Sequence, residues 1–252
     1  MEIITLGMGE RLRIAASRLS RIATDAYDRL LLLPIPTTKD KMHITATDIP
    51  LEEVFLHSRA GALAVGYELP AEIRHGLLLR GTDVLDLGYD ERLLGENAEI
   101  TARGALGHVL TTVKTDITEL KVGIIGYGRI GRALLRLLVF LGARARVYTT
   151  RDSVAEMLCD TGVVCEKITE STNFSGCDIL LNTAPARLID EERLSALLPS
   201  TRIIDLASGR NFPEREGIER LASIPELFYP VSAGRVYADG VERYLLGEVG
   251  IC

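Results

Sequence analysis

A glycine-rich segment near the middle of the chain has the spacing that nucleotide chemistry requires. The apolar run 122–125 leads into Gly126-Tyr127-Gly128-Arg129-Ile130-Gly131, and a helical pattern continues over residues 132–141. In a dinucleotide-binding loop the first glycine permits a tight turn, the second lets the backbone approach the pyrophosphate, and the third lets the helix pack on the strand. The N–H groups at the start of that helix then face the phosphates. We therefore expect residues 126–131 to bind a dinucleotide; the alternative is a glycine turn in an ordinary α/β unit.

The loop after the next expected strand indicates which dinucleotide is bound. That strand pattern ends in Thr149, Thr150 and Arg151. NAD-specific sites usually carry an acidic residue there, which accepts hydrogen bonds from the adenosine ribose. Hydroxyls and a cation suit a ribose 2′-phosphate instead, so we predict NADP as the cofactor, with NAD as the alternative. Asp152 follows closely, and its expected role is to cap the next helix, a role that Ser153 could also fill.

Polar residues also follow two further expected strands, at the edge where ligands bind in open parallel sheets. The segment Asn182-Thr183-Ala184-Pro185 follows the apolar run 179–181. Asn182 and Thr183 are candidate partners of the nicotinamide-side ribose, and Pro185 would stiffen the loop. The structural alternative for Asn182, given equal weight, is a satisfied polar group that closes the strand end.

Asp205 and Ser208 lie at the end of the run 203–206 and just beyond it. Either side chain could orient the carboxamide of the cofactor or the substrate, so both are candidate catalytic residues. Asp205 could also simply close a strand end, but burying a carboxylate without a partner is costly, and we therefore favour a functional role slightly.

Two α/β domains are expected to position these residues. Residues 1–95 predict a small α/β domain, and residues 119–231 predict a doubly wound parallel sheet, that is, a Rossmann domain. The connector 96–118 is expected to be a helix over 98–113, and the segment 232–252 a helix that crosses back to the first domain. The expected strands span residues 3–6, 29–33, 62–65, 84–86, 122–125, 146–148, 163–165, 179–181 and 203–206, and the other expected helices 10–22, 70–79, 128–141, 153–159 and 191–198.

The composition argues against several functional classes. The chain has 252 residues, enough for two small domains, and a net charge of −6 without a basic run, so nucleic-acid binding is not expected. The N-terminus has no signal-peptide pattern, and the apolar stretches are too short to cross a bilayer. The four cysteines and four histidines show no metal-ligand spacing. We expect reduced thiols, no bound metal and a cytoplasmic protein.

Several of these segments together resemble the A subunit of dipicolinate synthase. The resemblance is carried by the glycine loop, by residues 97–104, and by three runs that read RLLLLPIPTT (29–38), DILLNTAP (178–185) and IIDLAS (203–208). It implies NAD(P) as cofactor and a two-domain architecture related to the D-2-hydroxyacid dehydrogenases. It also implies oxidation of a cyclic dihydro- or hydroxytetrahydro-dipicolinate to the aromatic diacid in spore-forming bacteria, together with a flavoprotein-like second subunit.

The chain departs from that family's pattern at several positions. The single strand and helix expected before Asp25 replace a longer α/β unit, which implies a shortened N-terminal domain. Arg103 stands where the family has a glutamate, and residues 209–212 stand where it has a glycine-rich loop. Ser232 follows a valine where the family has a lysine, and no lysine occurs after Lys167. These departures concern the substrate site and leave the nucleotide site intact.

A cyclic diacid would need hydroxyls, cations or helix N-termini around its carboxylates. The expected substrate-binding residues share short polar side chains in loops or near helix starts, and they are Thr37, Thr38, Asn97, Thr101 and Ser232.

Arg103 completes the candidate catalytic set with Asp205 and Ser208. It lies near the expected start of the connector helix, where a cation opposes the helix dipole, and this conflict hints at a ligand or a domain contact. Arg59 and Arg210 are better explained as solvated surface cations. No general acid or base stands out.

Two neighbouring dehydrogenase classes are disfavoured. D-2-hydroxyacid dehydrogenases use a late histidine, and none follows His108; short-chain dehydrogenases use Tyr-x-x-x-Lys, which does not occur.

Two hypotheses about function remain. The first is an NADP-linked oxidoreductase of the same type as the dipicolinate synthase family, a homodimer that takes a small anionic substrate between its domains. The second is a non-catalytic relative that binds nucleotide or regulates a partner.

Overall fold

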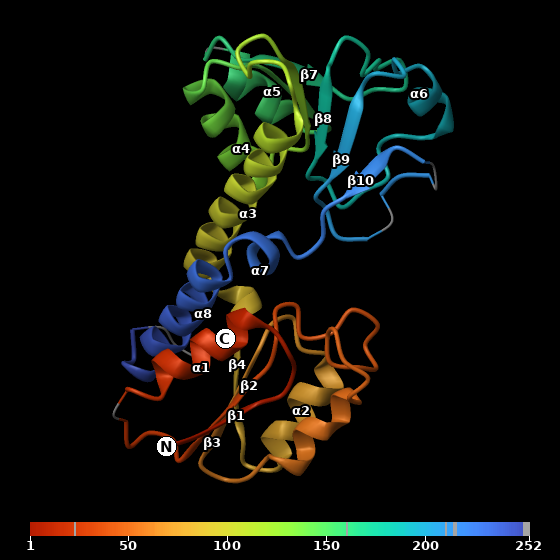
Figure 1. The fold of residues 1–252 in the computed structure, drawn as a ribbon. Coiled ribbons are helices and arrows are strands. Elements are labelled where there is room, and N and C mark those ends of the chain that lie inside the picture. The colour runs from red at the N-terminus through yellow and green to blue at the C-terminus, as the bar shows by residue number, and fades with distance from the viewer. Residues whose placement is uncertain (23, 160, 210, 214–215, 249–252) are drawn as a thin grey trace. The chain divides into compact units, whose positions relative to one another are not determined.

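The computed structural model describes residues 1–252 except 23, 160, 210, 214–215 and 249–252. The chain forms two compact units, which we call unit 1 (residues 1–97 with 225–252) and unit 2 (residues 98–224). Each unit contains a parallel β-sheet flanked by helices, and the predicted α/β fold class is confirmed (Figure 1).

Unit 1 is built on four parallel strands in the order β1-β2-β3-β4. Side chains alternate between its faces: Leu30 and Leu32 pack with the helices of one face, and Leu31 and Leu33 with those of the other. Helices α1 and α8 cover the first face, and η1 and α2 the second. The elements are β1 (Glu2–Thr5), α1 (Glu10–Leu19), β2 (Arg29–Leu32), η1 (Leu51–Leu56), β3 (Ala62–Gly66), α2 (Ala71–Leu79), β4 (Asp83–Asp86), η2 (Leu87–Tyr89), α7 (Ile224–Phe228, which begins at the unit boundary) and α8 (Pro230–Leu245).

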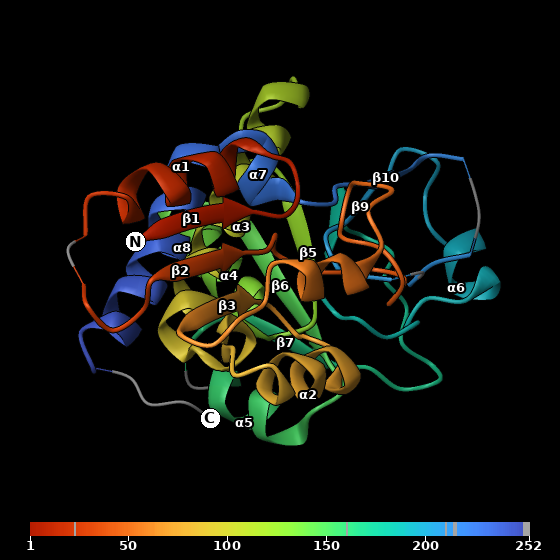
Figure 2. The ribbon, with the colours of Figure 1, turned by 90° about the horizontal axis from the view of Figure 1, so that it is seen from below.

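The connections of unit 1 differ in handedness. Helix α1 covers one face of the sheet and α2 the opposite face (Figure 2). Each of the two helices nevertheless connects a strand to its next neighbour in the same direction across the sheet, from β1 to β2 and from β3 to β4. The crossovers β1–α1–β2 and β3–α2–β4 therefore have opposite hands, and one of them departs from the nearly universal right-handed rule. Helix α1 packs along α8, so the C-terminal helix helps to hold it on its face.

Unit 2 contains six parallel strands in the order β10-β9-β8-β5-β6-β7, which is the doubly wound dinucleotide-binding order. The direction of strand order reverses between β5 and β8, and ligands bind outside the carboxyl ends of the strands at such a point. Helices α3, α4 and α5 pack on one face, and α6 with long loops covers the other. The elements are α3 (Glu91–Thr112, of which residues 91–97 belong to unit 1), β5 (Lys121–Ile125), α4 (Arg129–Phe140), β6 (Arg144–Thr149), α5 (Asp152–Cys159), β7 (Val164–Lys167), β8 (Ile179–Asn182), α6 (Glu191–Ser195), β9 (Arg202–Asp205) and β10 (Ile218–Arg220).

The long helix α3 begins at Glu91, not at residue 98 as the sequence pattern predicted. Asp90 explains the earlier start, because its carboxylate accepts the N–H of Leu93 at 3.0 Å and so caps the helix. Gly95 weakens the sequence signal without stopping the helix. The short elements η1, η2, β10 and α7 were not predicted, since each has six residues or fewer and too little periodicity to detect.

Within the described part of the chain, no helix is both long enough and apolar enough to span a bilayer. The same residues hold no group of three or more histidines, cysteines or carboxylates arranged to bind a metal ion.

Candidate nucleotide site

The three glycines of the loop after β5 have the three geometries that the sequence predicted. Gly126 has a φ of +92°, and a Cβ there would lie 2.9 Å from Oγ1 of Thr183. A Cβ on Gly131 would overlap the carbonyl oxygen of Gly126. A Cβ on Gly128 would meet no atom within 4 Å, so this glycine faces open space. The loop thus has a tight turn, a close helix–strand contact and an open backbone, which fits a bound pyrophosphate.

Helix α4 presents its N-terminus beside this open backbone. Gly128 is its N-cap residue and offers no side chain to cap the first turn. The N–H groups of the first turn have no partner within the helix, and the helix dipole adds a partial positive charge there. Tyr127 and Ile130 are half-buried and pack against the apolar core of the sheet, so they position the loop. Arg129 is exposed in the first turn.

The end of β6 adds hydroxyls and one cation. Thr149 is buried, and its Oγ1 accepts the N–H of Arg151 at 3.2 Å. Thr150 and Arg151 are exposed. The guanidinium of Arg151 donates to the carbonyl oxygen of Tyr127 at 2.7 Å, so this cation lies directly against the glycine loop. Of the three residues predicted to hold a 2′-phosphate, Thr150 and Arg151 are accessible, and Thr149 shapes their loop.

Sequence reasoning missed one neighbour of this loop. Asp152 is the first residue of α5, and its Oδ1 lies 2.6 Å from Nζ of Lys167, the last residue of β7. The sequence pattern ended this strand at residue 165, so nothing marked Lys167 as a residue of the carboxyl edge. A strand pattern extended by two residues would have found it.

Asn182 and Asp205 form a buried pair at the ends of β8 and β9. They are register partners, only 2% and 3% exposed, and the Asn182 amide donates to Oδ1 of Asp205 at 2.8 Å. Asn182 also bonds both backbone groups of Ala184, and Asp205 accepts the N–H of Ala207. The Asp205 carboxylate therefore has a hydrogen-bond partner, Asn182. The sequence favoured a functional role for Asp205 only because a buried carboxylate without a partner is costly, and this hydrogen bond removes that reason. Both side chains shape the switch-point edge.

Thr183, just after β8, hydrogen-bonds the end of that strand to the start of the glycine loop. Its hydroxyl donates to the carbonyl of Ile125 at 3.0 Å and lies 3.3 Å from that of Gly126. Pro185 and Ser208 are exposed beyond the strand ends. Arg210 lies outside the described residues.

Most of the predicted substrate residues of unit 1 are engaged in local structure. Thr37 is 0% exposed; its hydroxyl donates to the carbonyl of Pro34 and accepts the N–H of Tyr67. Thr38 is half-buried, and its hydroxyl donates to Asp40 at 3.2 Å.

The other two candidates of unit 1 lie on helices. Asn97 accepts a hydrogen bond from the buried Arg11 at 3.4 Å. Ser232 is half-buried in the first turn of α8.

Arg103 lies in the middle of α3, so the premise that it sits near a helix start is wrong. Its side chain is 54% exposed and pairs with Glu99 at 3.4 Å. Glu99 also pairs with Arg136 of α4, so this carboxylate bridges two cations. Thr101 is buried in the same helix and has a polar partner.

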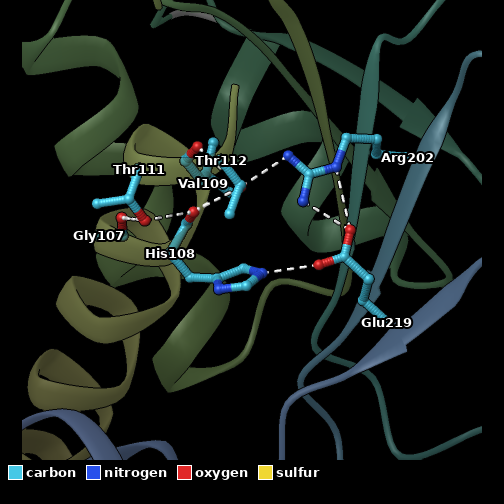
Figure 3. Close-up of polar contacts among 7 residues, drawn as sticks. All are labelled: Gly107, His108, Val109, Thr111, Thr112, Arg202 and Glu219. Carbon is cyan, nitrogen blue, oxygen red and sulfur yellow. Dashed lines mark hydrogen bonds and ion pairs between the residues drawn. The ribbon is translucent and has the colours of Figure 1, made fainter. Parts of the chain in front are cut away.

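His108 belongs to a separate polar cluster that attaches α3 to the edge of the sheet (Figure 3). Its Nε2 lies 2.7 Å from Glu219 on β10, and Glu219 also binds Arg202 of β9 at 2.6 Å. Arg202 donates in turn to Oγ1 of Thr112 at 2.8 Å. Burial alone would raise the pKa of Glu219, but the hydrogen bonds from His108 and Arg202 outweigh it and hold that pKa below its usual value. The cluster therefore has a structural role, because it joins α3 to strands β9 and β10.

Comparison with known proteins supports the identification of the nucleotide site. Residues 96–223 match the family model of the D-isomer specific 2-hydroxyacid dehydrogenase, NAD binding domain. The A subunit of dipicolinate synthase from Bacillus subtilis (strain 168) is 28% identical over 161 residues, 61% of this chain and 54% of that protein. Glyoxylate reductase of Thermococcus onnurineus (strain NA1) is 26% identical over 117 residues, 45% of this chain and 35% of that protein. The chain thus spans about half or less of the curated relatives that it matches.

The fold also matches a solved structure over nearly its whole length. The A subunit of dipicolinate synthase from Bacillus halodurans superposes with a TM-score of 0.76 at 18% identity, covering 97% of both chains. The strand order, the glycine geometry and these matches agree on one relationship. The chain belongs to the family of NAD-binding domains of D-isomer specific 2-hydroxyacid dehydrogenases and is a homologue of the A subunit of dipicolinate synthase.

Proposed function

We propose that this protein is an NADP-linked oxidoreductase that oxidises a cyclic diacid of the dihydro- or hydroxytetrahydro-dipicolinate type by hydride transfer. The observation that carries the proposal is the glycine loop, whose open Gly128 backbone and uncapped helix N-terminus fit a pyrophosphate. The relationship to the A subunit of dipicolinate synthase supports the substrate class.

The preference for NADP rests on the residues at the end of β6. Exposed Thr150 and Arg151 stand where NAD-specific sites usually carry an acidic residue. The Arg151 guanidinium donates to the carbonyl oxygen of Tyr127, so this cation lies against the glycine loop that would hold the pyrophosphate. A guanidinium binds phosphate oxygens strongly, because the hydrogen bonds are charge-assisted.

When bound, the nicotinamide supplies a hydride acceptor. The residues of this chain would bind and orient it: the backbone of residues 126–131 holds the phosphates, and the Asn182–Asp205 pair fixes the backbone at the switch point. Ser208 and Pro185 lie beyond the strand ends, where the nicotinamide side of the cofactor is expected. Ser208 is the candidate that could orient the carboxamide or the substrate by hydrogen bonding.

Enzyme assays would test this proposal directly. The purified protein is incubated with NADP⁺ or NAD⁺ and pyridine dicarboxylate precursors, and reduced nicotinamide is followed by its absorbance. Turnover with NADP⁺ and a cyclic diacid, lost in a Gly128→Val variant, supports the proposal. Nucleotide binding without turnover of any such diacid would contradict the oxidoreductase assignment.

A non-catalytic, nucleotide-binding relative is the second candidate function. One observation favours it: two side chains predicted to act at the substrate site have other partners. The Thr37 hydroxyl is buried in hydrogen bonds of its own loop, and Arg103, a candidate catalytic residue, forms an exposed ion pair. Because the curated relative is named as one subunit of a synthase, we also propose that this chain assembles with a second, flavoprotein-like subunit or as a homodimer. Light scattering of the purified protein, alone and with a candidate partner, would test this assembly.

A further inference from the structure

The end of β7 brings a second cation to the loop that follows β6. Lys167 and Thr149 are register partners at the carboxyl ends of these strands. The N–H of Ile168 donates to the carbonyl of Thr149 at 2.7 Å, which fastens the two strand ends together. Nζ of Lys167 lies 2.6 Å from Oδ1 of Asp152, so the ammonium pairs with the residue that follows Arg151 in the chain.

The charges around this loop are arranged to favour an anion. Arg151 belongs to this loop, and its side chain extends to the glycine loop, where it donates to Tyr127. Lys167 reaches the same loop from the end of β7, through its ion pair with Asp152. Asp152 is the carboxylate nearest along the chain to the end of β6. Unpaired, it could accept hydrogen bonds from ribose hydroxyls, as an NAD-type site does, and it would repel a 2′-phosphate. The ammonium of Lys167 neutralises it.

We propose that the Asp152–Lys167 ion pair determines the preference for the adenosine 2′-phosphate. In this arrangement Lys167 is a phosphate ligand together with Arg151, and it also prevents Asp152 from acting as an NAD-type ribose acceptor. The inference deepens the proposed function and rests on dinucleotide binding at the glycine loop. A lysine is a common phosphate ligand, because its compact charge can pair with any phosphate oxygen.

Variants of this pair are expected to fold. The two side chains are 47% and 67% exposed, and exposed ion pairs contribute little to stability. Lys167→Gln removes the cation, and Asp152→Asn removes the carboxylate while leaving the cation. Lys114→Gln is a matched control, because Lys114 is an exposed lysine in the loop between α3 and the amino end of β5.

The test measures nucleotide affinity and needs no catalysis. NADPH and NADH are titrated by nicotinamide fluorescence, and 2′,5′-ADP and 5′-AMP by calorimetry, against the full chain and each variant. Lys167→Gln is expected to weaken NADPH and 2′,5′-ADP binding by about tenfold or more, the effect of one charge-assisted hydrogen bond. NADH and 5′-AMP binding should be unchanged or tighter, because Asp152 is released. Asp152→Asn should tighten NADPH binding, and Lys114→Gln should change nothing.

The outcomes separate the two proposals. If the unmodified protein binds neither dinucleotide, the proposed function itself fails, and this inference fails with it. If it binds them and Lys167→Gln weakens both equally, or neither, then only the role of the ion pair is overturned. A tenfold effect confined to the nucleotides with a 2′-phosphate supports it.

Discussion

The carboxyl edge of the unit 2 sheet and the loop after β2 in unit 1 both carry residues that the sequence marked as functional. At the first, backbone geometry around Gly126, Gly128 and Gly131 forms a surface that fits a phosphate. At the second, the hydroxyls of Thr37 and Thr38 are engaged in hydrogen bonds of the loop itself. The backbone site was easier to predict from the sequence than the side-chain site, because a positive φ or a close backbone approach almost requires glycine, and the spacing of the three glycines is visible in the chain.

Substitutions in the glycine loop are expected to have the largest effects. Gly128→Val places a side chain in the open space over the backbone, and NADPH binding should fall by about 100-fold or more as several phosphate hydrogen bonds are lost. The melting temperature should fall only slightly, because the new side chain meets no other atom although valine is a poorer N-cap than glycine. Fluorescence titration and thermal unfolding measure the two properties.

Gly131→Ala is the matched variant that separates packing from binding. Its Cβ would overlap the carbonyl of Gly126, so helix and strand must move apart, at a cost of about 1–3 kcal/mol in the free energy of unfolding. An unchanged urea midpoint for Gly131→Ala, or a Gly128→Val variant destabilised as much as Gly131→Ala, would contradict the different roles given to the two glycines.

Substitution in the buried Asn182–Asp205 pair should have the next largest effect on stability. Asp205→Ala leaves the Asn182 amide without its acceptor at 2.8 Å, and the free energy of unfolding should fall by about 1–3 kcal/mol in urea titrations. Ser208→Ala, at an exposed position, should change it by less than about 0.5 kcal/mol. Equal effects would show that the pair does not hold this edge.

Thr37→Val tests whether the Thr37 hydroxyl of unit 1 has a structural role in its loop. Removing its buried hydroxyl should lower the free energy of unfolding by about 1 kcal/mol, because the hydrogen bonds to Pro34 and Tyr67 are lost. Thr38→Val should cost less, since its hydroxyl is only half-buried. If Thr37→Val instead left urea stability intact and raised the substrate KM, Thr37 would be a substrate ligand after all.

Glu219→Gln should have the smallest effect, and one that depends on pH. The folded-state pKa of Glu219 lies below its ordinary value of 4.5, so its contribution is present above that value and is lost as the pH falls through the folded-state pKa. The variant should be less stable by about 1 kcal/mol or less near pH 7, because the partly exposed pair is screened by solvent. Unfolding in urea at pH 7 and pH 3 measures this, and a difference that grows at low pH would contradict it.

The sequence predicted most of the fold because apolar runs and glycines report backbone geometry directly. Every strand except β10 was located to within two residues at each end, as residues 122–125 and β5 (Lys121–Ile125) illustrate. The start of α3 was misplaced because the cap at Asp90 lies before a weakly periodic segment containing Gly95. The topology of unit 1 could not be read from the chain, because the face that α1 covers depends on its packing with α8.

The side-chain part of the site was less accessible to sequence analysis. Whether Asn182 and Asp205 act on a ligand or on each other depends on their register, which places them as neighbours on adjacent strands. Lys167 was missed because the expected strand 163–165 ended two residues before it, so its place beside Thr149 was not anticipated. Distances between strands decide these roles, and one sequence does not contain them.

The most direct test of the central claim is a fluorescence titration of the unmodified protein with NADPH and NADH. The chain contains no tryptophan, so the signal comes from the reduced nicotinamide itself. The account predicts saturable binding of both nucleotides, with NADPH clearly tighter. Absence of saturable binding, or tighter binding of NADH, would contradict it.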